Sequence, residues 1–76
     1  MKTYEAYERE YNQIVKSAKP GTLVVKKELW IGFKVCDDEN IEPQDPKFQS
    51  WFNSLDERLQ NCVYATLIAA IMNNKK

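Results

Sequence analysis

The run C62-V-Y-A-T-L-I-A-A-I-M72 decides how the rest of this chain must fold, because only Thr66 in it is not apolar. Residues at helical spacing form one stripe that begins before this run and continues through it. Its members are Leu55, Leu59, Cys62, Val63, Thr66, Leu67, Ala70 and Ile71. A helix that is apolar nearly all round must be buried on several sides. The run therefore predicts a central helix that a second copy of the protein completes. The expected dimer interface is the remaining circumference, Tyr64, Ala65, Ile68, Ala69 and Met72.

The sequence upstream of this run predicts where the helix begins. S-L-D-E is typical of a capping box, in which Ser54 caps the helix and Glu57 reaches back to it. A shorter segment, 47–53, precedes it, and Asp45-Pro46 is a favourable helix opening. The periodicity allows one helix over 46–73, about 42 Å long at 1.5 Å per residue. That length exceeds the width of so small a domain, so we favour a short helix, a break at Asn53-Ser54 and a long helix.

The stretch 22–36, T-L-V-V-K-K-E-L-W-I-G-F-K-V-C, carries the β-rich composition of the chain. All of its odd positions except Lys27 are apolar and most of its even positions are not, which is the alternation of a half-buried strand. The pattern leaves open whether the stretch is a hairpin turning near Lys27-Glu28 or one long strand. A hairpin is favoured because a solitary strand leaves its backbone groups unpaired.

The remaining segments complete an α+β prediction. An amphipathic helix is expected over 3–18, capped by Thr3, and 37–46 is expected to be an exposed acidic loop. The predicted fold is a small single domain over 1–76 of order α-β-β-α-α. In it, an antiparallel hairpin packs against the central apolar C-terminal helix.

Composition narrows the possible functions. Eleven basic and eleven acidic side chains give no net charge, so there is no overall attraction to nucleic acid or to an anionic membrane. Two cysteines without any histidine are too few for a disulfide scaffold or a zinc site. The apolar run is well short of the ~20 residues of a membrane span, and the first residues lack a signal peptide's apolar core. We expect a soluble cytoplasmic protein without metal or cofactor.

No catalytic constellation is visible, so the leading hypothesis is a non-enzymatic protein that binds another protein. It would act as a homodimeric accessory factor or inhibitor, of the kind that mobile elements encode. Aromatic side chains dominate interface energetics. The expected partner-binding residues are therefore Phe48, Trp51 and Phe52, with Trp30 added.

The alternative hypothesis is a nucleic-acid-binding protein. Lys26, Trp30 and Lys34 share the outward parity of the predicted β-segment, and an aromatic ring flanked by lysines can stack on a base. Zero net charge and the acidic segment that follows disfavour this alternative.

Overall fold

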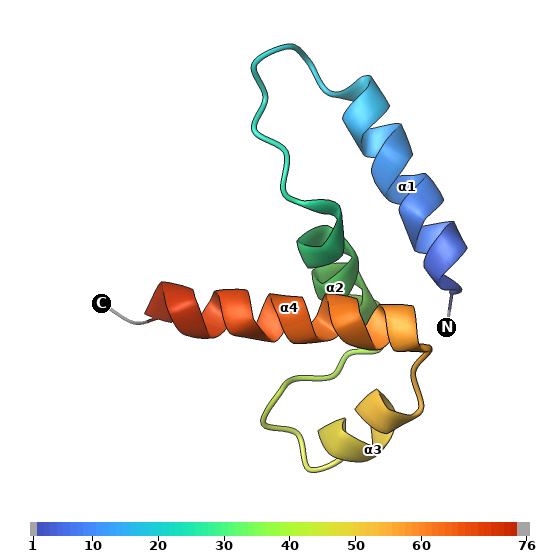
Figure 1. Cartoon of the computed structure of the whole chain (residues 1–76), viewed down its shortest axis with the longest axis vertical. Coiled ribbons are helices and arrows are strands. Elements are labelled where there is room, and N and C mark those ends of the chain that lie inside the picture. Colours follow the sequence, from blue (N-terminus) through green and yellow to red (C-terminus); the bar gives the residue numbers. More distant parts are fainter. Residues whose placement is uncertain (1, 75–76) are drawn as a thin grey trace.

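The protein is all-helical in the part of the chain that the computed structural model describes, residues 2–74. Within these residues, four helices follow one another: α1 (Tyr4–Ser17), α2 (Lys27–Asp38), α3 (Phe48–Asn53) and α4 (Glu57–Asn74). The long helix α4 crosses α2, which also packs against α1 (Figure 1). No strand occurs between residues 2 and 74. The predicted α+β fold, with its α-β-β-α-α order and antiparallel hairpin, is therefore wrong.

The error has a definite cause in the spacing of the apolar residues of 27–38. Ile31 and Val35, the buried apolar side chains of α2, are four positions apart. A spacing of four places two side chains on the same face of a strand and also on the same face of a helix. The position of Phe33 distinguishes a strand from a helix. A strand would bury Phe33 beside Ile31, whereas α2 turns it outward and leaves it 55% exposed.

The first half of the predicted β-segment, 22–26, is an extended linker. Lys19 to Thr22 form a turn closed by the Thr22 amide on the Lys19 carbonyl, at 3.1 Å. Pro20 and Gly21 are the two central residues of this four-residue turn. Gly21 has a positive φ (88°), as the second central residue of a Pro-Gly turn commonly does. The Tyr11 hydroxyl then donates to the Val25 carbonyl at 2.6 Å, which ties the linker to α1.

Helix α1 confirms the amphipathic helix expected near the N-terminus. The Thr3 hydroxyl accepts from the Ala6 amide at 3.2 Å, so Thr3 is the N-cap, as predicted. Two contacts join α1 to α4: Arg58 pairs with Glu5 at 2.6 Å and lies over the Tyr4 ring, 4.7 Å from its centroid.

The end of α2 shortens the predicted acidic loop. Asp37 and Asp38 form the last turn of the helix, so the loop begins at residue 39 instead of 37. The Ile41 amide donates to the Cys36 carbonyl and the Asn40 amide to the Asp37 carbonyl, both at 3.1 Å. With Asn40 at a φ of 51°, these bonds form a Schellman motif, which satisfies the last carbonyls of the helix.

The segment 46–73 forms two helices, and the favoured break near Asn53-Ser54 is confirmed. The predicted capping box is wrong, however. Ser54 ends α3, donating its hydroxyl to the Trp51 carbonyl at 2.6 Å. The cap of α4 is Asp56, whose carboxylate accepts from the Arg58 amide at 2.8 Å.

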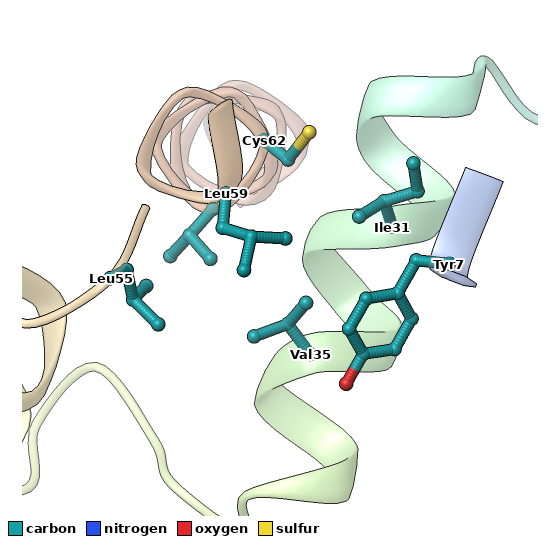
Figure 2. Packing of buried hydrophobic residues seen from close by; sticks show 7 residues of the cluster. Tyr7, Ile31, Val35, Leu55, Leu59 and Cys62 are labelled. Carbon is teal, nitrogen blue, oxygen red and sulfur yellow. The ribbon is translucent and has the colours of Figure 1, made fainter. Parts of the chain in front are cut away.

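The core lies where α2 crosses α4, with α1 on one side and the α3–α4 connection on the other. Figure 2 shows the small set of side chains at this crossing. Its buried apolar members are Tyr7, Ile31, Val35, Leu55, Leu59, Cys62 and Val63. Gly32 sets the closeness of the crossing, because a Cβ there would overlap the Thr66 hydroxyl and the Cys62 carbonyl. The Thr66 hydroxyl bonds the Cys62 carbonyl of its own helix at 2.9 Å and reaches across the crossing to the Leu29 carbonyl of α2 at 3.3 Å.

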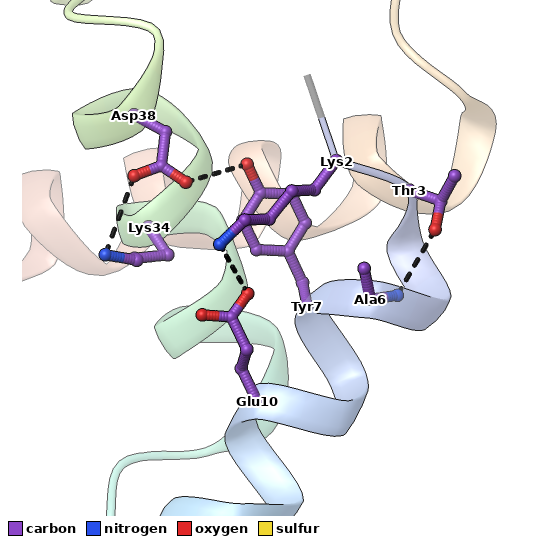
Figure 3. A network of polar contacts seen from close by, with 7 residues as sticks. All are labelled: Lys2, Thr3, Ala6, Tyr7, Glu10, Lys34 and Asp38. Atoms are coloured by element: carbon purple, nitrogen blue, oxygen red, sulfur yellow. Dashed lines mark hydrogen bonds and ion pairs between the residues drawn. The ribbon is translucent and has the colours of Figure 1, made fainter.

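A polar network covers the α1–α2 side of this core. The buried Tyr7 donates its hydroxyl to Asp38 at 3.0 Å, and Lys34 pairs with the same carboxylate at 3.5 Å (Figure 3). Lys2 lies over the Tyr7 ring and bonds Glu10 at 2.8 Å, and this hydrogen bond raises the pKa of Lys2. Burial, followed by the hydrogen bond to Asp38, raises the pKa of Tyr7 well above its ordinary value.

The raised pKa of Tyr7 predicts that the protein loses stability in alkaline solution. An unfolded tyrosine loses its proton near pH 10, whereas folded Tyr7 keeps it, so the free energy of unfolding should fall as pH rises above about 10. We expect Tyr7→Phe to cost about 1–2 kcal/mol at pH 7 and to remove much of this alkaline slope. Urea unfolding at pH 7, 10 and 11 measures both effects. Since both proteins keep the same cysteines, equal slopes would contradict the assignment to Tyr7.

Candidate interaction surface

The side of α4 that faces away from α2 carries a continuous row of large apolar side chains. We call it the α4 outer face, and its members are Tyr64, Ile68, Ile71 and Met72. Each is between 43% and 67% exposed, although spacings of four, three and one place them on one side of a helix. Leu59, Val63 and Thr66 lie on the opposite side, buried in the crossing with α2. The C-terminal half of α4 runs out beyond α2 (Figure 1).

This surface overlaps the dimer interface expected from the sequence. Of those residues, Tyr64, Ile68 and Met72 are exposed, and the half-buried Ala65 and Ala69 lie along one border. The sequence placed Ile71 in the buried stripe, but it is 60% exposed. Its spacing from Tyr64 and Ile68 could have revealed this, because i+3 and i+7 neighbours share a helix face.

The whole molecule exposes more surface than a compact protein of its mass. Its accessible surface is 5835 Å², against about 4,800 Å² expected for a folded 8.9 kDa monomer. The radius of gyration is 13.2 Å, against about 11 Å for a compact chain of this length. The excess of roughly 1,000 Å² exceeds the ~800 Å² that each partner buries in a standard protein–protein interface.

The aromatic residues expected to bind a partner form a cluster on α3 that packs inward. Phe48, Trp51 and Phe52 are half-buried against the core, and the Phe48 ring lies 5.5 Å from Trp51 and 5.9 Å from Phe52, centroid to centroid. The indole Nε1 of Trp51 is buried without a hydrogen-bond partner among the described residues. The cluster therefore contributes mainly to the fold, and its binding role stays a prediction.

The residues of the nucleic-acid hypothesis do come together, but on a helix. Lys26, Trp30 and Lys34 follow one side of α2 at spacings of four. The Trp30 ring packs on Tyr11, with centroids 5.8 Å apart, and Lys34 pairs with Asp38. Trp30 and Lys34 are thus engaged within the protein, and nucleic-acid binding remains the disfavoured alternative.

Two adjoining hollows flank Phe33 on the outer side of α2. One, of about 300 Å³, is lined by Trp30, Phe33, Lys34 and Asp37. The other, of about 260 Å³, is lined by Phe33, Cys36, Asp37, Asn40, Ile41 and Glu42. Phe33 and Asp37 border both hollows, so the two form one surface, which we call the Phe33 groove. This groove was not predicted, because the alternating pattern of 22–36 placed Phe33 in the core.

The remaining reactive groups are few. Among residues 2–74, no cluster of three or more histidine, cysteine, aspartate or glutamate side chains is arranged to hold a metal ion. Both cysteines are free thiols, and burial raises the pKa of each. A raised pKa lowers the thiolate fraction and so the reactivity of a cysteine. Within the same residues, no helix has the length and apolar content needed to cross a membrane.

Comparison with known proteins found no matching family model, no matching curated protein and no matching solved structure.

Proposed function

We propose that this chain is a non-enzymatic accessory factor or inhibitor that acts by binding another protein, and that it works as a homodimer joined through the α4 outer face. The observation that carries the proposal is that face itself, four large apolar side chains that the described chain leaves between 43% and 67% exposed. Covering them with a second copy removes apolar surface from water, at about 25 cal/mol for each Å² buried.

The composition of α4 supports association with a second copy. From Leu59 to Asn74 the sequence has no charged residue, and the centres of protein interfaces are depleted of charge. A twofold dimer uses the same patch on both subunits, which an uncharged apolar patch allows without repulsion. Ala65 and Ala69 on the border would let two helices approach closely. We propose a cytoplasmic location, where Cys36 and Cys62 would stay reduced.

Sedimentation velocity over a concentration series tests the homodimer. We expect a species of twice the 8.9 kDa chain mass that dissociates only on strong dilution. A particle of 8.9 kDa that persists at millimolar concentration would refute pairing. A tagged chain should also retain its protein partner at high salt, because apolar contacts are not screened. Retention of nucleic acid with a steep salt dependence would instead support the alternative.

A further inference from the structure

The second surface, the Phe33 groove, has the shape and the charge of a site for a separate partner. We infer that it binds a basic amphipathic segment of another protein, in which cationic side chains alternate with apolar ones. This inference rests on the proposed function, since it names the chemical class of the partner that the homodimer would bind.

The shape of the groove follows from how α2 ends. Phe33 is 55% exposed and stands between the two hollows, so an apolar guest side chain can pack on either side of its ring. The Schellman motif around Asn40 brings Ile41 back against Cys36, and both residues line the second hollow. The first hollow is therefore mainly apolar, whereas polar groups make up most of the second, and the two together belong to a helix and to a hydrogen-bonded turn.

The charge at this end of the molecule is one-sided. Residues 35–46 contain five acids and no lysine or arginine, and two of these acids, Asp37 and Glu42, line the groove. The carboxylates of Asp37 and Glu42 lie near the C-terminus of α2, where the helix dipole is also negative and therefore does not compensate their charge. Lys34 is paired with Asp38, whereas Asp37 makes no ion pair among residues 2–74.

These groups specify what the guest must carry. A lysine or arginine can pair with Asp37 and lie over the exposed ring of Phe33, which attracts a cation. Apolar neighbours at helical spacing would fill the hollows beside Phe33, as in other helix-in-groove complexes. One competing occupant lies in the chain itself, because residues 14–27 hold four lysines and no acid. A second copy could present that stretch, so the test must separate it from a foreign segment.

The experiment uses the full chain and a labelled 14-residue peptide of leucine and arginine in amphipathic order. Fluorescence anisotropy should show saturable binding that weakens only modestly as salt rises, because the ion pair with Asp37 is screened by salt and the apolar contacts with Phe33 are not. Phe33→Ala and Asp37→Asn should each weaken it about tenfold or more, as expected for central contacts of an interface. Each has a matched control away from the groove that should leave binding unchanged: Ile14→Ala for exposed apolar area and Glu57→Gln for charge.

The outcomes are separable. Equal binding of a leucine–glutamate peptide of the same order, or no effect of Phe33→Ala and Asp37→Asn, would overturn the inference. If Phe33→Ala lowers the sedimenting mass, a second copy occupies the groove and the inference is also wrong. If the unaltered chain is a monomer yet binds the peptide through Phe33, the homodimer fails while the groove assignment stands. If Ile68→Glu breaks the dimer while the unaltered chain fails to bind the peptide, the homodimer stands and the groove assignment fails.

Discussion

Replacing Gly32 by alanine is expected to destabilise the whole fold. The new Cβ would overlap the Thr66 hydroxyl and the backbone of Cys62, whose carbonyl carbon would lie 2.9 Å away. A side chain can rotate aside, but the Cys62 backbone cannot move unless α4 moves away from α2. Separation of these helices would open the core around Ile31 and Val63. We expect a cost of about 3 kcal/mol, a large fraction of the stability of a domain this small.

Thermal unfolding followed by far-ultraviolet circular dichroism measures this effect. A loss of about 3 kcal/mol lowers the midpoint by roughly 12–24 °C in a domain of this size. The matched control is Gly21→Ala, where the added Cβ meets no atom within 4 Å. Its positive φ costs about 1 kcal/mol, so the control should melt only a few degrees lower. Equal midpoints for the two variants would contradict the close crossing.

A second substitution at the crossing distinguishes the clash with the Thr66 hydroxyl from the clash with the Cys62 backbone. Thr66→Ala removes the hydroxyl that the Cβ of an alanine at position 32 would meet, but it leaves the Cys62 carbonyl in place. The double variant should therefore recover only part of the stability lost in Gly32→Ala. Full recovery would show that the side chain, and not the backbone, limits the approach of the helices.

Ile68→Glu is expected to convert the proposed homodimer into a folded monomer. Ile68 lies in the middle of the α4 outer face and is 43% exposed, so a carboxylate there can reach water while the chain is alone. In a twofold interface, two such carboxylates would be buried close together, which is costly without partners. We expect dissociation to become at least about 100-fold easier, equivalent to roughly 3 kcal/mol.

Sedimentation velocity and circular dichroism together check this result. The variant should sediment with the mass of one chain and keep the helical content of the original. The matched control is Ile14→Glu on α1, because Ile14 is 48% exposed but lies outside the α4 outer face. It should leave the sedimenting mass unchanged. A dimer that survives Ile68→Glu would place the pairing surface elsewhere, and a monomeric original would remove the basis of the proposal.

Local sequence signals determined several parts of this molecule correctly. The Thr3 cap and the amphipathic pattern of 3–18 predicted α1. The periodicity of 46–73 allowed a single helix, and the small size of the domain favoured the short helix, break and long helix that the structure has. The cap of α1 depends on neighbours within a few residues, which is the range over which capping chemistry acts.

The tertiary structure alone decided the state of 22–38. Ile31 and Val35 fit a strand and a helix equally well, and the β-branched residues before them favoured the wrong one. The deciding contact is between Gly32 and α4, thirty residues away, because only a helix places that glycine against Cys62 and Thr66. The same contact turned Phe33 outward and created the groove beside it. The sequence thus determined which side chains are apolar. The packing of α2 against α4 determined which of these apolar side chains are buried and which remain exposed to water.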